Sequence, residues 1–110
     1  MQIEKRDNYT LILSETSSFT EFYNSFLIEE KKYIDNNIVI QFSDNINITT
    51  EDYLLFLNIS VTKKQNGTSF VIISSDIDID DFPENLNIVP TLQEAEDVIE
   101  MEDIERDLGF

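Results

Sequence analysis

The sequence predicts a single α/β domain over residues 1–110, with a mostly parallel central sheet of about four or five strands and three main helices. Two apolar runs, Ile38–Phe42 and Ser69–Ile73, have the near-continuous hydrophobicity of strands that are covered on both faces. Segments with helical spacing of apolar residues separate these runs, and strands that alternate with helices favour a parallel sheet. With 110 residues, 41% of them hydrophobic, the chain is large enough for one core.

The first elements predict an N-terminal β-hairpin. Ile3–Asp7 and Tyr9–Ser14 have the pattern of two short strands around a turn at Asp7-Asn8. Leu11 and Leu13 alternate with Thr10 and Ile12, so we expect the two leucines on one face of the sheet.

A helix near 18–34 is expected next. Ser17 or Ser18 provides the cap, and Glu21 stands three residues after Ser18, as in a capping box. Apolar residues then repeat at helical intervals, which predicts a face packed on the core rather than a stack for a ligand. The members of this stripe are Phe19, Phe22, Tyr23, Phe26, Leu27 and Ile34.

A second helix is predicted over 50–64, beginning at Thr49 or Thr50 and stopped by Asn66-Gly67. Lys63 and Lys64 fall in its last turn, where cations suit the helix dipole. We expect its buried side to consist of Tyr53, Leu54, Leu57 and Val61.

The last predicted elements are a strand at Leu86–Val89 and a helix near 91–105 that Thr91 caps, with Glu94 completing a capping box. The helix residues expected to face inward are Leu92, Ala95, Val98, Ile99 and Ile104.

Composition excludes several classes of chemistry. The chain has no His and no Cys, which removes thiol nucleophiles, imidazole acid–base catalysis and the usual zinc, haem and iron–sulfur sites. No acidic pair stands out as hydrolytic machinery, so we expect neither an enzyme nor a cofactor.

The charge points to a protein as the partner. Twenty-three acidic residues against seven basic ones give a net charge of −16, which opposes binding to nucleic acid or to an anionic membrane. Residues 76–110 alone hold thirteen acids and one base, Arg106. The first ten residues lack an apolar signal region, and we expect a cytoplasmic protein.

Three strings resemble the STAS domain family, of the anti-sigma-factor antagonist type. Ile38–Ser43 (IVIQFS) is similar to the family's third strand, and Ile46–Leu55 to its functional loop and the start of its second helix. Ile88–Ala95 (IVPTLQEA) is similar to its final strand and last helix. The resemblance implies regulation by docking to a protein through residues 45–55. More narrowly, the chain resembles small acidic Bacteroidetes proteins often labelled ribonuclease Z, a label that its lack of His contradicts.

The switch loop departs from the family pattern of Asp-Ser-Ser/Thr-Gly. The corresponding residues are Thr49, Thr50, Glu51 and Asp52, with Glu51 at the position that is phosphorylated in the family and Asp52 in place of Gly. These residues also make a good helix cap with acids in the first turn. We expect Thr50 to be the cap and not a phosphosite, while Glu51 is either part of the cap or a permanent negative charge.

An acidic stretch offers a second, different function. Asp76, Asp78 and Asp80 begin like a calcium loop, but Asp81 occupies the position that needs Gly and Asn87 the position that needs Glu. A solvated loop is the favoured interpretation. The alternative functions are a Ca²⁺- or Mg²⁺-binding protein that uses Asp76–Asp81, and a structural subunit of a larger assembly.

The acidic C-terminal extension, residues 100–110, places Ile104, Leu108 and Phe110 among acids. One interpretation is a helix that continues along its own domain. The other, which we favour, is a helix that docks Ile104, Leu108 and Phe110 into a groove of a partner with a basic surface.

Overall fold

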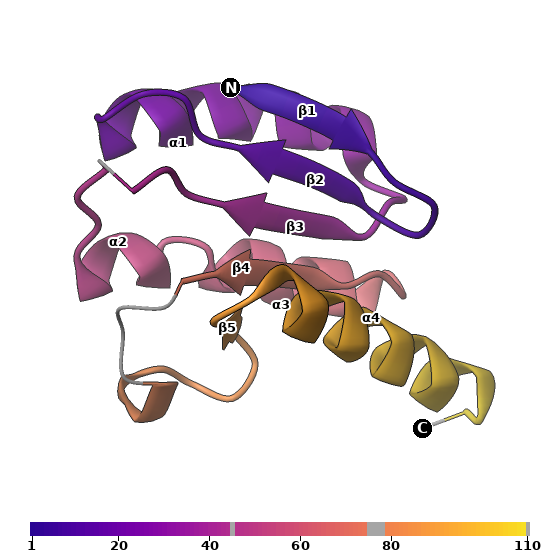
Figure 1. The fold of residues 1–110 in the computed structure, drawn as a ribbon. Helices are drawn as coiled ribbons and strands as arrows, with labels where there is room; N and C mark the ends of the chain where they lie inside the picture. The colour runs from indigo at the N-terminus through magenta and orange to yellow at the C-terminus, as the bar shows by residue number, and fades with distance from the viewer. Residues whose placement is uncertain (45, 75–78, 110) are drawn as a thin grey trace.

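The computed structural model describes residues 1–44, 46–74 and 79–109. Its centre is a five-stranded sheet in the order β1-β2-β3-β4-β5, in which β1 pairs antiparallel with β2 and the other neighbours are parallel (Figure 1). This arrangement confirms the predicted α/β class. The strands are β1 Gln2–Lys5, β2 Thr10–Leu13, β3 Ile38–Gln41, β4 Phe70–Ile73 and β5 Asn87–Val89.

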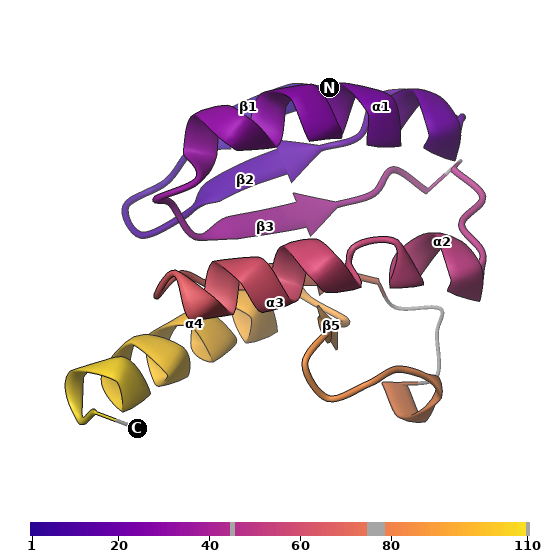
Figure 2. The same cartoon turned by 180° about the vertical axis from the view of Figure 1, so that it is seen from behind.

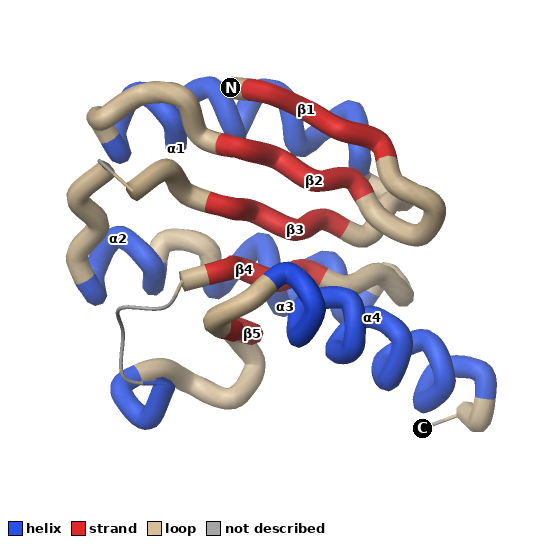
Figure 3. The backbone as a smooth tube through the Cα atoms, in the orientation of Figure 1, coloured by secondary structure: helices blue, strands red, loops and turns tan. Residues whose placement is uncertain are grey.

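Helices cover both faces of the sheet. The helices α1, α2 and α3 lie on one face, toward the viewer in Figure 2, and α4 lies on the other, toward the viewer in Figures 1 and 3. The helical elements are α1 Phe19–Glu29, η1 Glu30–Tyr33, α2 Thr50–Leu54, α3 Leu57–Gln65, η2 Ile79–Asp81 and α4 Leu92–Asp107.

The central strands β3 and β4 are buried on both faces, as the two apolar runs predict. Ile38, Val39 and Ile40 have no exposed surface, and Val39 pairs with Val71 of β4, which is also fully buried. A strand with both faces in contact with helices favours apolar side chains throughout, and the polar residue of β3, Gln41, stands at its half-buried end. This requirement accounts for the continuous apolar runs in the sequence.

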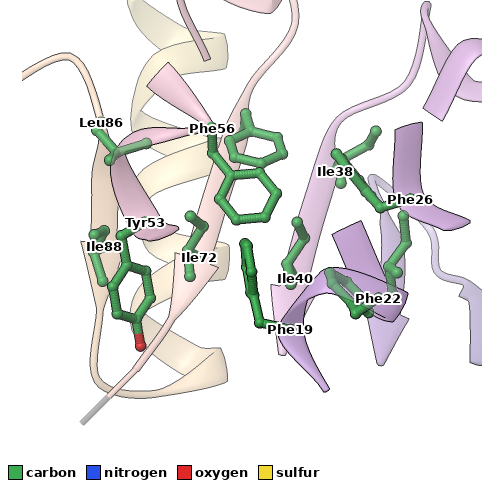
Figure 4. Close-up of a cluster of buried hydrophobic side chains, with 12 residues drawn as sticks. Phe19, Phe22, Phe26, Ile38, Ile40, Tyr53, Phe56, Ile72, Leu86 and Ile88 are labelled. Atoms are coloured by element: carbon green, nitrogen blue, oxygen red, sulfur yellow. The ribbon is translucent and has the colours of Figure 1, made fainter. Parts of the chain in front are cut away.

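The larger core cluster is aromatic and lies between the sheet and α1, α2 and α3 (Figure 4). Phe56 is fully buried, and its ring makes edge contacts with Phe19 at 5.9 Å and Phe26 at 5.5 Å and a stacked contact with Phe70 at 5.9 Å between centroids. Such contacts stabilise the core beyond the area they bury. Phe56 therefore links α1 to the sheet through the segment between α2 and α3.

The opposite face has a smaller core beneath α4. Ala95 and Ile99 are buried there against Leu11 of β2 and the two valines of β3 and β4, and Leu13 packs against the same cluster. Leu11 and Leu13 thus share one face, as predicted.

The predicted helix over 50–64 is wrong in one respect, because it consists of two helices. Backbone N–H groups of Leu55 and Phe56 donate to carbonyls three residues back, at 3.2 and 3.1 Å, which tightens the chain and ends α2 before α3 begins. The predicted buried side is also partly wrong. Leu54 is 38% exposed, whereas Tyr53, Phe56, Ser60 and Lys63 face the core.

Two of these buried residues are polar, and both tie α3 to other segments. The Ser60 hydroxyl donates to the carbonyl of Asn85 at 2.6 Å. Lys63 is 3% exposed, and its ammonium donates to the carbonyls of Tyr33 and Ile34 at 3.1 and 3.4 Å. Burial lowers the pKa of Lys63 by removing water from the charged form. Lys63 therefore secures the end of η1, a role beyond the dipole contact that its sequence position suggests.

Two other expectations need correction. The predicted helix over 18–34 ends at Glu29, after which η1 forms a tighter turn and leaves Ile34 52% exposed instead of buried. Ile104 does not face inward either, because it is also 52% exposed. The caps are at predicted positions: Ser18 and Thr91 accept from the backbone N–H groups of Glu21 and Glu94. The capping box expected at Ser18 is not complete, because the Ser18 N–H donates to the Thr16 hydroxyl instead of to Glu21.

The split helix yields a first prediction. Phe56→Ala removes a fully buried ring that contacts five other aromatic rings, so we expect it to lower the free energy of unfolding by roughly 3–5 kcal/mol. Its neighbour Leu55 is 48% exposed, and Leu55→Ala serves as the matched control with a change within about 0.5 kcal/mol. Urea denaturation of both variants measures the difference. Equal losses would contradict the assignment of Phe56 to the core and of Leu55 to the surface.

Candidate functional site

The candidate site lies at the carboxyl edge, which we define as the edge where the parallel strands β2, β3, β4 and β5 end. A serine follows each of the first three strands there: Ser14, Ser43 and Ser74. The Ser14 hydroxyl accepts from the backbone N–H of Ser43 at 2.7 Å, and the N–H of Ser74 donates to Val89 at 2.8 Å. These bonds continue the strand ladders and hold the following loops in place. Residues 46–55, which are expected to dock a partner, follow β3 at this edge.

A hollow of about 340 Å³ opens at this edge beneath the segment that leads to α2. Phe42 and Tyr53 form an aromatic part of its wall, with ring centroids 6.0 Å apart at an angle of 80°. The Tyr53 hydroxyl donates to Ser74 at 2.8 Å, which anchors α2 to the end of β4. Figure 4 shows Tyr53 beside the core residues Ile72 and Ile88, with its hydroxyl at the outer end. The hollow is therefore bounded by side chains that the core holds in position.

The segment predicted to be the switch loop forms a capping box at the start of α2. The Thr49 hydroxyl accepts from the backbone N–H of Asp52 at 3.1 Å, and the Asp52 carboxylate accepts from the N–H of Thr49 at 3.1 Å. The cap is thus Thr49, and the expectation that Thr50 is the cap is wrong. Thr50 is the first helical residue and is exposed, because only Thr49 has the extended backbone that a cap requires.

The basic residues are confined to one edge of the sheet, whereas the acidic residues are found at both. The seven Lys and Arg residues all lie toward the amino edge, at the end of β1 and in the turn after it, in η1 and in the last turns of α3 and α4: Lys5, Arg6, Lys31, Lys32, Lys63, Lys64 and Arg106. The carboxyl edge carries Glu15, Asp44, Glu51 and Asp52. Among the described residues, the cation at this edge is the N-terminal amino group of Met1, which lies 3.0 Å from the Glu15 carboxylate. The carboxyl edge is therefore a surface of negative potential.

Two exposed leucines lie at the end of α2, next to these acids. Leu54 is 38% and Leu55 48% exposed, and Glu51 is one helical turn before them. An apolar centre with a charged rim is the composition of a protein-docking surface. We call Glu51, Leu54 and Leu55 the α2 patch.

The second half of α4 is bound to the amino edge of its own domain. The Glu102 carboxylate accepts from the Ser69 hydroxyl at 2.6 Å and from the Asn87 amide at 3.1 Å. Asp103 accepts from the Asn8 amide at 2.8 Å and from Arg106, which also donates to Ser69 at 3.2 Å. These contacts favour the interpretation of residues 100–107 as a continuation of the domain over the one of a protruding helix.

The outer face of α4 nevertheless presents an apolar stripe. Met101, Ile104 and Leu108 are 54%, 52% and 65% exposed, and their spacing of three and four residues places them on one side of the helix. Gly109 ends the helix with a φ of +82°, the left-handed conformation expected at its position. Ile104 and Leu108 thus lie together and are accessible, whereas Phe110 lies outside the described residues.

The acidic stretch provides little support for a metal site. Asp76 and Asp78 lie outside the described residues, and Asp80 is exposed in η2. Asn87, at the last position of the calcium-loop pattern, is the first residue of β5, and its amide is engaged with Glu102. Within the described part of the chain, no three acidic side chains are placed to hold a metal ion.

Comparison with protein-family models finds no match for this chain, and comparison with curated proteins finds none either. Among the helices of residues 1–44, 46–74 and 79–109, none has both the length and the apolar character that crossing a membrane requires.

The capping box predicts different effects for the two adjacent threonines. Thr49→Ala removes the acceptor for the Asp52 N–H, and we expect it to lower the free energy of unfolding by about 1 kcal/mol. Thr50→Ala alters an exposed helical residue and is expected to change it by less than about 0.5 kcal/mol. Thermal denaturation of the two variants decides between the caps, and a larger loss from Thr50→Ala would restore Thr50 as the cap.

Tyr9 joins α4 to the hairpin at the amino edge, and its ionisation reports on that contact. Its hydroxyl donates to the Glu96 carboxylate at 2.7 Å. Burial, followed by the bond to Glu96, raises the pKa of Tyr9 from its usual 10.0 to about 12. The neutral phenol is therefore favoured in the folded state, and its stabilising effect is complete below pH 10 and lost as the pH rises toward 12.

We expect Tyr9→Phe to lower the free energy of unfolding by about 1.5 kcal/mol at neutral pH, because it deletes a hydrogen bond to a charged acceptor. The difference from the unmodified protein should shrink between pH 10 and pH 12, as Tyr9 becomes ionised. Urea denaturation at pH 7, 10, 11 and 12 measures it. A difference independent of pH across this range would contradict the assigned contact.

Proposed function

We propose that this chain is a non-enzymatic regulatory protein that acts by docking to another protein through its carboxyl edge. The docking surface consists of the α2 patch together with Asp44 and the capping box at Thr49. The partner presents a basic surface with an apolar centre. Docking is an equilibrium process, and the amount of complex follows the concentrations of the two proteins.

The observation that carries this proposal is that all seven Lys and Arg residues lie toward the amino edge, away from the α2 patch. The exposed leucines of the patch, Leu54 and Leu55, follow the acids Glu51 and Asp52 at the carboxyl edge. A basic partner approaching a molecule with a net charge of −16 is attracted at long range and oriented toward this edge. Salt weakens that attraction.

The apolar stripe of α4 is proposed as a second contact. Met101, Ile104 and Leu108 are exposed, while the opposite side of the helix is fastened to the sheet through Glu102 and Arg106. A helix that is held rigidly presents its stripe with little loss of conformational entropy on binding. The acids around the stripe again suit a basic partner.

The resemblance to STAS domains of the anti-sigma-factor antagonist type is part of this proposal. The order of elements and the position of residues 46–55 at the start of α2 support it. Glu51 supplies a fixed negative charge where the family pattern has a phosphorylated hydroxyl. A carboxylate has less charge and fewer acceptor oxygens than a phosphate, so we propose that docking depends on Glu51 itself and not on a phosphorylation cycle.

A charge reversal in the α2 patch tests the proposal. Glu51→Lys places a cation beside Leu54 and Leu55, and we expect it to reduce capture of the basic partner by the immobilised protein at least tenfold at low salt. Asp7→Lys makes the same change in the β1–β2 turn, at the amino edge, and should leave capture within about twofold. Quantitative mass spectrometry of the captured proteins gives the ratio. Equal retention by both variants would contradict docking at the carboxyl edge.

A further inference from the structure

We propose that the hollow at the carboxyl edge receives an arginine side chain of the docked protein, with Asp44 as the counter-ion and Phe42 and Tyr53 as the aromatic wall. The inference rests on the proposed function, since it names the group of the partner that enters this surface. The proposed arginine site is the interior of the hollow, whereas the α2 patch is the separate apolar surface beside it.

The volume of the hollow fits one long side chain. Its 340 Å³ lies near the lower limit of about 300 Å³ for pockets that enclose small ligands. It is open to solvent and is formed by the ends of β3, β4 and β5 and the segment before α2. A side chain that projects from a protein docked on the α2 patch can therefore enter it.

The chemistry of the lining selects a cation. Among the described lining residues the charged one is Asp44, and it is exposed. Gln41 and Asn47 also line the hollow, and an amide side chain can accept hydrogen bonds from a guanidinium through its oxygen. With the Lys and Arg residues all toward the opposite edge, an incoming cation meets no repulsion from side chains of this chain.

The same residues disfavour an anion. A helix start beside a hollow is a common place for a phosphate, but here the capping box occupies the N–H groups of Thr49 and Asp52 with the chain's own side chains. The carboxylate of Asp52 already neutralises the positive end of α2, and Glu51 adds a second negative charge. An added anion would face three carboxylates, including Asp44.

The aromatic wall distinguishes arginine from lysine. The planar guanidinium stacks on aromatic rings and donates in several directions at once, while the lysine ammonium is a compact and strongly hydrated charge. Tyr53 is 5% exposed and hydrogen bonded to Ser74, and Phe42 packs on the core cluster, so both rings are held in position. A rigid ring beside a carboxylate suits a guanidinium.

The probe is the peptide acetyl-Gly-Ser-Arg-Ser-Gly-amide, compared with the same peptide carrying neutral citrulline, which has nearly the same shape. In two-dimensional ¹H–¹⁵N NMR titrations of the full chain, we expect the arginine peptide to shift the amides of Ser43, Asn47 and Ser74. The citrulline peptide should bind at least threefold more weakly. A lysine peptide should fall between the two.

Two variants locate the effect. Asp44→Asn should weaken binding of the arginine peptide roughly threefold to fivefold, and Asp44→Lys should abolish it. Asp44 is exposed, so neither change disturbs the core. Asp7→Asn, which removes an exposed acid at the amino edge, is the matched control and should leave the affinity unchanged.

The outcomes separate this inference from the proposed function. Equal binding of the arginine and citrulline peptides, or shifts spread over the acids of α4, would overturn the arginine site. If Glu51→Lys still abolished partner capture, docking would stand without it. In the opposite case, Glu51→Lys would leave partner capture unchanged, and docking through the α2 patch would fail. If the peptide still shifted Ser43 and Ser74 in a way that depended on Asp44, the hollow would stand as an arginine site.

Discussion

The pairing of β3 with β4, two strands with both faces buried, is the constraint from which the rest of the architecture follows. Ile38, Val39 and Ile40 have no contact with water, and the residues opposite them in β4 are equally buried. Such strands need helices on both sides, and parallel neighbours need crossover connections that return the chain to the same edge. Consequently α1 and the α2–α3 pair begin at one edge and end at the other.

That topology also explains the position of the bases. Helices that follow parallel strands begin at the carboxyl edge and end at the amino edge, so bases, which suit helix ends, gather at the amino edge. The acids are not confined in this way, since the end of α4 carries Glu102 and Asp103. Glu51 and Asp52 occupy the first turn of α2, and Lys63 and Lys64 the last turn of α3. The position of the bases, on which the proposed docking depends, therefore agrees with ordinary helix electrostatics, and the net charge of −16 leaves the carboxyl edge acidic.

The fold was predictable because its main signals are periodic and local. Apolar runs predicted β3 and β4, and the caps at Ser18 and Thr91 are visible as short patterns. The buried face of α3 was not predictable in the same way, since Ser60 and Lys63 are polar by type and become core residues only through carbonyls supplied by distant segments. Hydrophobicity therefore favoured Leu54, which is exposed.

The candidate site was predictable only in part. The segment Thr49–Asp52 stood out as a cap, but the choice of Thr49 over Thr50 depended on one backbone angle. The hollow is formed from three strand ends, and no single segment of the sequence predicts it.

The C-terminal helix α4 packs on its own domain with one face and leaves another face free for a partner, so both interpretations of its sequence can apply. A short acidic helix is marginal in water, and repulsion between its carboxylates opposes folding. Here three of its polar residues, Glu102, Asp103 and Arg106, bond to the starts of β2, β4 and β5, which stabilises the helix without using its apolar residues. Ile104 and Leu108 are thereby left exposed on a helix that is already ordered. Since a partner would not have to order this helix on binding, even a small apolar contact there can add to affinity. Folding and docking thus depend on different faces of α4, so substitutions of Ile104 or Leu108 can alter docking while the polar contacts continue to hold the helix on the sheet.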